Sequence, residues 1–485
     1  MPAYDYDLVC IGSGPAGQRA AVQAAKIGKK VAVVEKQRSV GGVCIETGTI
    51  PSKTFREAVL AFRARHSSHH GDGAPTRPSM EQLLRRVARV VQREGELVED
   101  QLTRNEVELV RGRAAFEDPH TLVVDAGNGS RRLSAANVLI AVGTRASEPP
   151  DVKPDGETVI LSDHIPGLHK LPHSMVVVGG GVIGVEYASI FAAIGVHVTV
   201  VDKRPRPLEF VDQEIVDELI HQMRKNDVTF RGGEAVRSIE IGEGPPRRGV
   251  VELESGKHVV GDVILFSVGR IGATDSLNLA AVGLEADDRG RMVVDAQLRT
   301  KVPHVYAAGD VIGYPALAAT SSEQGRLAAC HMFGLEAEPM GPHFPIGVYA
   351  IPEISMVGAT EEELTRNKVP YETGIARFRE IARGQIMGDD SGLFKMIFHR
   401  ETGRLLGAHC IGTGATELVH IGQAVLALGG GLDYFLKTVF NYPTLAECYK
   451  VAAFNAANKL QYGRSVKAAR VTPESSTAEQ PVRQP

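Results

Sequence analysis

The hydrophobic pattern near the start of the chain predicts a strand, a turn, a helix and a second strand. Tyr6–Ile11 is a mostly apolar run of the length typical of a buried parallel strand. A glycine-rich turn and an alanine-rich helical segment follow it, and a second apolar run over Lys30–Val34 ends at Glu35. This order of elements predicts a βαβ unit.

The same arrangement occurs again in the middle of the chain. Met175–Val178 is an apolar run that leads into another glycine-rich turn and a helical pattern, and a further apolar run, His197–Val201, ends at Asp202. In both units the acidic residue lies 23 positions after the first glycine of the turn. Glycines that served packing alone would explain neither acid. The repeat therefore predicts two nucleotide-binding units in an α/β fold.

Each turn has the spacing Gly-x-Gly-x-x-Gly, starting at Gly12 in the first unit and at Gly179 in the second. The first glycine allows a tight turn, the second lets a pyrophosphate approach the backbone, and the third lets helix and strand pack closely. The phosphates then lie at the positive N-terminus of the helix, and the acid accepts hydrogen bonds from ribose hydroxyls. We therefore expect two Rossmann-like domains, each of which binds a dinucleotide.

Two further motifs indicate which dinucleotide the first unit binds. Val138–Thr144 is a strand that leads into a Gly-Thr turn, which suits the point where the chain leaves the first domain. After Thr300 and six further residues comes Ala307–Asp310, which resembles the second fingerprint of flavoproteins that bind two dinucleotides. In those proteins the aspartate accepts hydrogen bonds from the ribityl region, whereas an ordinary strand turn would use Asp310 as a helix cap. Together with Glu35, the motif favours FAD in the first unit.

The segment Gly41–Lys53, with the sequence GGVCIETGTIPSK, resembles a motif of the pyridine nucleotide-disulfide oxidoreductases, the family of dihydrolipoamide dehydrogenase and glutathione reductase. The resemblance extends over about residues 4 to 462. It implies FAD in the first unit, a nicotinamide dinucleotide in the second, and a C-terminal α+β dimerisation domain that forms a homodimer or a higher homo-oligomer. It also implies that Lys53 and Glu186 form an ion pair beside the flavin ring and serve as the catalytic residues.

These motifs together assign residues to two sites and order the domains along the chain. For FAD the expected residues are Gly12, Gly14, Gly17, Glu35, Lys36, Gly42, Val43, Cys44, Thr49, Lys53, Gly143, Gly309 and Asp310. For the nicotinamide nucleotide they are Gly179, Gly181, Ile183, Gly184, Glu186, Asp202, Lys203, Arg204 and Gly269. The expected domains are the first part of the FAD domain at 1–150, the NAD(P) domain at 151–272, the second part of the FAD domain at 273–343, the interface domain at 344–464 and a disordered tail at 465–485.

Two departures from the family pattern argue against disulfide chemistry. Where the relatives keep a second cysteine after Cys44, this chain has Thr49, whose hydroxyl cannot form a disulfide. Where they keep a histidine before Pro443, it has Tyr442, although Glu447 is retained. A phenol has a pKa near ~10 and is a poor general base at neutral pH. Cys44 is then better explained as a packing residue, and the combination resembles the transhydrogenase branch of the family, which passes hydride between NADPH and NAD through FAD.

The second nucleotide site has features suited to both nicotinamide nucleotides. Asp202 suits the 2′-hydroxyl of NAD and repels the 2′-phosphate of NADP. Lys203, Arg204 and Arg206 could pair with that phosphate, although a charge run after a strand is also typical of a solvated loop. We therefore expect a flavoenzyme that accepts NAD and NADP at one site. The alternatives are an NAD(P)H dehydrogenase with a quinone or dye acceptor, and a non-catalytic FAD-binding module that senses redox state.

The composition argues against several other functions. Fifty-four basic and 58 acidic side chains give a net charge of −4, which disfavours nucleic acid and anionic membranes as partners. Five widely spaced cysteines do not form a secreted disulfide framework. The most apolar stretch, Met175–Val201, contains Glu186 and several glycines and is not a membrane span. We expect a cytoplasmic protein without a metal site, since the clustered His66, His69 and His70 lie in a loop-like segment without a nearby cysteine.

Overall fold

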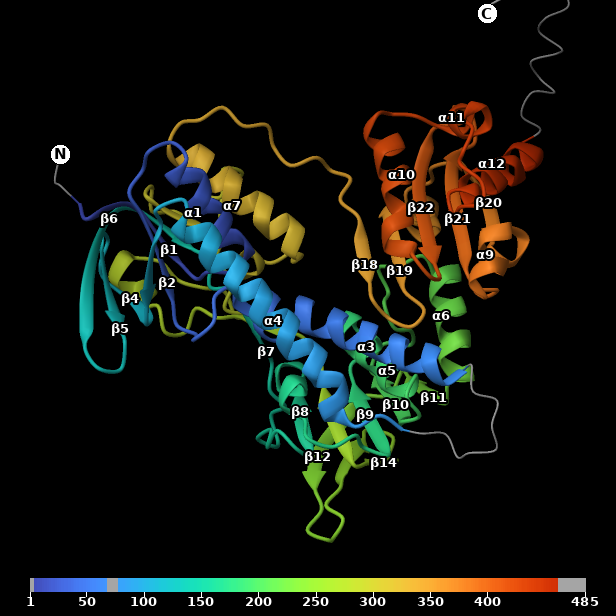
Figure 1. Cartoon of the computed structure of the whole chain (residues 1–485), viewed down its shortest axis with the longest axis horizontal. Coiled ribbons are helices and arrows are strands. Elements are labelled where there is room, and N and C mark those ends of the chain that lie inside the picture. Colours follow the sequence, from blue (N-terminus) through green and yellow to red (C-terminus); the bar gives the residue numbers. More distant parts are fainter. Residues whose placement is uncertain (1–3, 68–76, 461–485) are drawn as a thin grey trace, which may run out of the picture. The chain divides into compact units, whose positions relative to one another are not determined.

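The computed structural model describes residues 4–67 and 77–460 (Figure 1). Of the clustered histidines in the sequence analysis, His66 lies in a helix (Thr49–Ser67) rather than in the expected loop-like segment, whereas His69, His70 and the predicted tail at 465–485 lie outside what the structure describes. Contacts divide the chain into two compact units, which are described separately. The first spans Met1–Phe210, Val216–Pro342 and Val348–Ile351, and the second spans Val211–Ile215, His343–Gly347 and Pro352–Pro485.

A seven-stranded sheet lies in the part of the first unit that contains the first glycine turn. Its strands are ordered β3-β2-β1-β6-β5-β4, and β17 pairs with β6. Strands β1, β2, β3, β6 and β17 are parallel where they pair, whereas β4, β5 and β6 pair antiparallel. Their bounds are β1 (Tyr6–Ile11), β2 (Val31–Glu35), β3 (Glu108–Arg111), β4 (Arg113–Asp118), β5 (Thr121–Asp125), β6 (Ser130–Ile140) and β17 (Val305–Ala307).

The central strands of this sheet are buried on both faces, as their apolar sequences predict. Leu8 on β1 is paired with Val31 on β2, and both are buried. Helices α1 and α7 pack against each other beside this sheet (Figure 1). Helix α4 begins at a capping box in which Ser79 and Gln82 bond each other's backbone N–H groups. The helices are α1 (Pro15–Ala25), α2 (Gly42–Glu46), α3 (Thr49–Ser67), α4 (Met80–Thr103) and α7 (Ala318–Met332).

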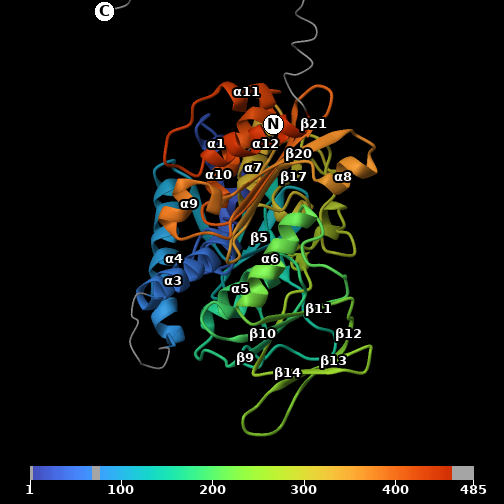
Figure 2. The ribbon, with the colours of Figure 1, turned by 90° about the vertical axis from the view of Figure 1, so that its right-hand side faces the viewer.

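A five-stranded sheet, parallel throughout, lies in the part of the same unit that contains the second glycine turn. Its order is β11-β10-β9-β15-β8, and α5 lies beside β10 and β11 (Figure 2). These elements are β8 (Val159–Leu161), β9 (Ser174–Val178), α5 (Val182–Ala192), β10 (His197–Asp202), α6 (Gln213–Lys225), β11 (Val228–Gly232) and β15 (Val263–Phe266). Strands β12 (Val236–Ile241), β13 (Gly249–Leu253) and β14 (His258–Gly261) form an antiparallel sheet, and β7 (Thr144–Ala146) pairs with β16 (Arg270–Gly272). The described residues of this unit also form the short 3-10 helices η1 (Ser162–Gly167), η2 (Leu279–Val282) and η3 (Asp310–Ile312).

The second unit is a five-stranded sheet with helices packed on it. The strand order is β18-β19-β22-β21-β20, and α10 and α12 contact the sheet (Figure 2). Aromatic side chains fill the core between sheet and helices, including Phe394, Phe435 and Tyr449. The elements are β18 (Ile346–Val348), β19 (Ile354–Gly358), α8 (Glu361–Arg366), β20 (Tyr371–Arg377), η4 (Phe378–Glu380), α9 (Ala382–Met387), β21 (Leu393–His399), β22 (Leu405–Ile411), α10 (Ala415–Ala427), α11 (Leu432–Lys437) and α12 (Glu447–Lys459).

The observed sheets confirm the predicted fold class, because a mixed sheet and a parallel sheet each lead into a glycine turn and an α+β region follows them. The predicted domain boundaries at 150, 272, 343 and 464 stay predictions. Among the helices of the described residues, none is long and apolar enough to span a membrane.

Candidate functional site

The first glycine turn has the geometry that a dinucleotide site requires. Gly12 has a φ of 105°, and a Cβ there would lie 2.4 Å from the carbonyl oxygen of Ala141. A Cβ at Gly17 would lie 1.9 Å from the carbonyl oxygen of Gly12, so helix α1 can approach β1 only without a side chain there. A Cβ at Gly14 would meet no described atom within 4 Å, which leaves the backbone open to a ligand.

Glu35 is fixed directly behind this turn at the end of β2. Its Oε2 accepts hydrogen bonds from the N–H of Ser13 at 3.1 Å and from the Ser13 hydroxyl at 2.6 Å, and its Oε1 accepts one from the N–H of Gln37 at 2.8 Å. The Ser13 hydroxyl oxygen also accepts a hydrogen bond from the N–H of Gly41 at 2.8 Å. Ser13 thus connects the glycine turn with Glu35 and with the Gly41–Gly42 segment. Nothing in the sequence indicated this role, because Ser13 occupies a variable position of the Gly-x-Gly motif.

Residues from two other parts of the chain reach the same turn. A Cβ at Gly42 would lie 3.0 Å from the Cα of Gly14, and a Cβ at Gly309 would lie 3.2 Å from the Cβ of Ala16. Beside Gly309, the Asp310 carboxylate accepts a hydrogen bond from the Ser321 hydroxyl at 3.2 Å. The structure therefore brings three of the segments that the sequence assigned to FAD, namely Glu35, Gly41–Gly42 and Gly309–Asp310, to one turn.

The remaining residues expected at the first site lie on α2, on α3 or in loops. Lys36 is exposed just after β2, and Gly143 has a φ of 63° with no described atom within 4 Å of a Cβ there. Val43 and Cys44 lie on α2, and Thr49 is the first residue of α3.

The second glycine turn repeats the geometry of the first. Gly179 has a φ of 109°, and a Cβ at Gly184 would lie 1.9 Å from the Gly179 carbonyl oxygen. A Cβ at Gly181 would meet no described atom within 4 Å. Ile183 lies on α5, and Gly269 has a φ of 137° with open space around it among the described residues. This turn too leaves its backbone accessible in the middle.

Asp202 ends β10 beside this turn and is bonded to it. Its Oδ2 accepts a hydrogen bond from the N–H of Gly180 at 2.5 Å, and the Arg204 guanidinium pairs with both carboxylate oxygens. Partial burial opposes ionisation of Asp202, but the hydrogen bonds from Arg204 and Gly180 outweigh it and lower the pKa of this carboxyl. Lys203 is exposed, and Arg206 pairs with Asp217 at 2.6 Å.

Lys53 and Glu186, which are 133 residues apart, form an ion pair between α3 and α5. The Lys53 Nζ lies 2.7 Å from Glu186 Oε2 and 3.0 Å from Oε1. Glu186 Oε1 also accepts a hydrogen bond from the N–H of Tyr349 at 2.8 Å, and the Nζ lies 4.9 Å from the centre of the Tyr349 ring. The Glu186 side chain is 4% exposed and that of Lys53 is 25% exposed, so the lysine is the accessible member of the pair.

Cys44 has a hydroxyl, not a second thiol, as its neighbour. Burial raises the pKa of the Cys44 thiol, and the hydrogen bond with the Thr49 side chain only partly offsets this effect. All five cysteines of the chain are free. A half-buried thiol with a raised pKa is protonated at neutral pH and is a weak nucleophile.

In the second unit, Tyr442 and Glu447 lie before and at the start of α12. Tyr442 precedes the cis bond to Pro443, and its side chain is largely exposed. Glu447 Oε2 is buried without a hydrogen-bond partner among the described residues.

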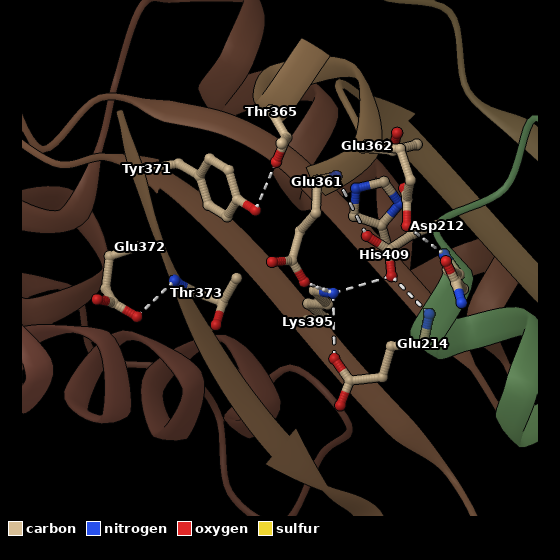
Figure 3. A network of polar contacts seen from close by, with 12 residues as sticks. Asp212, Glu214, Glu361, Glu362, Thr365, Tyr371, Glu372, Thr373, Lys395 and His409 are labelled. Atoms are coloured by element: carbon tan, nitrogen blue, oxygen red, sulfur yellow. Dashed lines mark hydrogen bonds and ion pairs between the residues drawn. The ribbon is translucent and has the colours of Figure 1, made fainter. Parts of the chain in front are cut away.

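A cluster of carboxylates in the second unit was not predicted from the sequence (Figure 3). Carboxylate oxygens of Asp212, Glu214 and Glu361 lie within 4.8 Å of one another, a spacing that could hold a metal ion. The Lys395 Nζ instead lies among them, 2.9 Å from Asp212 Oδ1 and 3.1 Å from Glu214 Oε2, and it also bonds Glu361. Burial opposes the charge on Lys395, but the carboxylates raise its pKa well above the usual range. The ammonium group therefore supplies the positive charge of this cluster.

Comparison with known proteins identifies the family. The profile "Pyridine nucleotide-disulphide oxidoreductase" matches residues 6–325, and the profile of the dimerisation domain of the same family matches residues 344–453. The chain belongs to the pyridine nucleotide-disulphide oxidoreductase family. The family predicted from GGVCIETGTIPSK is thus confirmed, and the fold class with it.

Curated relatives and solved structures match nearly the whole chain. The "Soluble pyridine nucleotide transhydrogenase" of Mycobacterium tuberculosis is 50% identical over 462 residues, covering 94% of this chain and 98% of that protein. The protein of that name from Chromohalobacter salexigens is 44% identical and covers 95% and 100%. Among solved structures, the HOCl-induced flavoprotein disulfide reductase RclA of Escherichia coli has a TM-score of 0.84 at 27% identity, covering 93% of this chain and 99% of that one. LpdA from Mycobacterium tuberculosis has a TM-score of 0.83 at 27% identity, covering 92% and 99%.

Proposed function

We propose that this chain is a transhydrogenase that passes hydride between NADPH and NAD with FAD as its bound carrier. The observation that carries the proposal is the contact between Cys44 and Thr49, because a disulfide reductase needs a second sulfur where this chain has a hydroxyl. The relatives at 50% and 44% identity are named soluble pyridine nucleotide transhydrogenases, which supports the same reaction.

The first site fits FAD by its own geometry. The open backbone at Gly14 suits a pyrophosphate at the N-terminus of α1, and Glu35 stands at the end of β2, where a ribose is expected. Asp310 and the Gly41–Gly42 segment reach the same turn and would hold the rest of the cofactor. When bound, FAD supplies a two-electron carrier that can receive and return hydride.

We assign Lys53 and Glu186 the catalytic roles. Glu186 holds the Lys53 Nζ in one position through two contacts, and the positive charge of Lys53 would stabilise negative charge on a bound flavin ring. The N–H of Tyr349 fixes the Glu186 carboxylate in turn. Because the Glu186 side chain is buried, rotation of either partner would leave an uncompensated charge, which keeps the ammonium in place.

The second turn, with Gly179, Gly181 and Gly184, would bind both nicotinamide nucleotides in succession. The backbone at Gly181 is open to a pyrophosphate, and Asp202 stands where the adenosine ribose is expected. Binding energy at this turn would orient the nicotinamide for transfer, and departure of the oxidised nucleotide would free the site for the other one.

The test mixes the purified, FAD-loaded protein with NADPH and thio-NAD and follows thio-NADH by its absorbance. Catalytic formation of thio-NADH is expected, and its absence would refute the proposal. A faster, saturable turnover with a quinone would instead favour the NAD(P)H dehydrogenase. Bound flavin that does not bleach with excess NADPH would favour a non-catalytic module.

The matched dimerisation domain indicates a homo-oligomer, and we propose specifically a cytoplasmic homodimer. Large apolar side chains remain exposed on the second unit, among them Leu428, Val439 and Tyr442. Sedimentation velocity should give twice the chain mass, and Val439→Asp should produce monomers. Cell fractionation of the native organism tests the location.

A further inference from the structure

The carboxylate of Asp202 is hydrogen-bonded by four N–H donors. Oδ1 accepts from the Arg204 main-chain N at 2.8 Å and from the Arg204 Nε at 3.0 Å. Oδ2 accepts from the Gly180 N at 2.5 Å and from the Arg204 Nη2 at 2.6 Å. A carboxylate offers about four lone-pair sites, so this one has none left for a further donor.

Two of the four donors are held by the backbone and cannot leave. The N–H of Gly180 belongs to the glycine turn, where a Cβ on Gly180 would lie only 3.1 Å from Asp202 Oδ2. The main chain at Arg204 is tied to the next strand, because its carbonyl oxygen accepts a hydrogen bond from the N–H of Gly233 at 2.9 Å. The Arg204 side chain, by contrast, is 37% exposed and can rotate into solvent. A ribose diol can therefore donate to Asp202 only when the guanidinium of Arg204 moves away.

The same arginine is suited to the nucleotide that Asp202 alone would reject. A 2′-phosphate beside a bare carboxylate would be repelled, whereas the bidentate guanidinium offsets the carboxylate charge. Arg204 has five N–H donors in its side chain and uses two of them on Asp202. Three donors remain on the outer edge of the guanidinium, in a fork that matches phosphate oxygens.

We propose that Arg204 is the residue by which one site accepts both nucleotides. It leaves Asp202 when NAD(H) binds, so that the carboxylate receives the ribose hydroxyls. It stays on Asp202 when NADP(H) binds and donates its outer N–H groups to the 2′-phosphate. This inference rests on the proposed transhydrogenase function and adds the basis of its nucleotide specificity.

The neighbouring basic residues are less suited to this role. Arg206 is directed to Asp217 on α6, with which it forms an ion pair at 2.6 Å. Lys203 is exposed and forms no side-chain hydrogen bond or ion pair with the described residues, so it adds positive potential without a fixed position. Of the three basic residues Lys203, Arg204 and Arg206, Arg204 is the one that contacts the Asp202 carboxylate in the described structure.

The test measures binding of ADP-ribose and of 2′-phospho-ADP-ribose to the FAD-loaded enzyme by titration calorimetry. Both probes lack nicotinamide, so the result does not depend on hydride transfer. Arg204→Ala should weaken binding of 2′-phospho-ADP-ribose about 10- to 100-fold, the range for hydrogen bonds between charged groups. The affinity for ADP-ribose should stay within ~3-fold of the wild-type value or become tighter. Asp202→Asn should do the reverse, weakening ADP-ribose about 10-fold without weakening the phosphorylated probe.

Two further variants make the outcome decisive. Arg237→Ala removes an exposed arginine that pairs with Glu252 on a different sheet, and it should change neither affinity. Arg206→Ala should weaken binding of 2′-phospho-ADP-ribose less than Arg204→Ala does. Equal weakening of both probes by Arg204→Ala would show that the residue only shapes the loop and would overturn the inference, as would a larger effect of Arg206→Ala. Failure of the transhydrogenase proposal itself would appear separately, as absence of thio-NADH in the wild-type enzyme.

Discussion

Replacing Lys395 by methionine should destabilise the second unit strongly. Methionine keeps the length of the side chain and removes the ammonium group from among Asp212, Glu214 and Glu361 (Figure 3). Lys395 is 1% exposed and Asp212 is 0% exposed, whereas Glu214 and Glu361 are 41% and 31% exposed and can turn toward water. The uncompensated charge is therefore chiefly that of Asp212, and removal of one partner of a buried pair costs about 3–5 kcal/mol.

The pH dependence of the stability lost in Lys395→Met shows whether the uncompensated charge of Asp212 causes it. Burial raises the pKa of Asp212, but His409 and Lys395 outweigh it, and the folded-state pKa lies below the usual value. In the wild type, the ionised Asp212 therefore stabilises the folded state fully above the unfolded-state pKa of about 3.9. This stabilisation is lost as the pH falls through the lower pKa that Asp212 has in the folded state. Without Lys395 the pKa of the buried Asp212 should rise, so the destabilisation should be largest near pH 7 and shrink toward pH 5.

Urea unfolding followed by far-ultraviolet circular dichroism measures the effect, since the chain has no tryptophan. Lys437→Met is the matched control in the same unit, because Lys437 is 77% exposed and pairs with Asp433 one helical turn away. That exposed pair should contribute no more than about 0.5 kcal/mol. A Lys395→Met variant as stable as Lys437→Met at pH 7, or one whose deficit grows as the pH falls, would contradict this reasoning.

Three further predictions concern the two nucleotide sites. Lys53→Met should lower kcat for thio-NAD reduction about 10²-fold with FAD still bound, measured by flavin absorbance, and Glu186→Gln should act in the same direction; full activity in both would remove them from the mechanism. Thr49→Cys should form a disulfide with Cys44, so that thiol titration after oxidation finds two fewer thiols than after reduction; equal counts would show that the two side chains are not aligned. Gly17→Ala should abolish FAD retention, because its Cβ would lie 1.9 Å from the Gly12 carbonyl oxygen, whereas Gly184→Ala, equally close to Gly179, should weaken nicotinamide nucleotide binding and spare FAD.

The two nucleotide-binding sheets could be predicted because their signals are local. A glycine turn between a buried strand and a helix has one structural solution, and the acid 23 positions later ends the next strand. The pair of Lys53 and Glu186 is different, since nothing in a separation of 133 residues indicates a contact, and only the resemblance to a family suggested it.

The carboxylate cluster around Lys395 was missed because its members come from distant segments of the chain. One signal was present, since Lys395 interrupts the apolar run of β21 and a lysine in a buried strand requires a buried partner. The sequence could not name Asp212 or Glu361 as that partner. In the same way, the charge run after β10 indicated an arginine near a phosphate, but not that Arg204 covers Asp202.

The threonine beside Cys44 and the pairing of Arg204 with Asp202 are both related to how many substrates the second site must bind. Because Thr49 stands beside Cys44, the first site has no dithiol to receive electrons, and under the proposed transhydrogenase function the donor and the acceptor both use the second site. Two nucleotides that differ by a 2′-phosphate then compete for Asp202, and a carboxylate with a fixed partner would exclude one of them. The two features nevertheless act on separate steps. Thr49→Cys should leave the ratio of affinities for ADP-ribose and 2′-phospho-ADP-ribose unchanged, whereas Arg204→Ala should shift that ratio without altering FAD content. A changed nucleotide preference in Thr49→Cys would show that the two sites are coupled through more than the shared reaction.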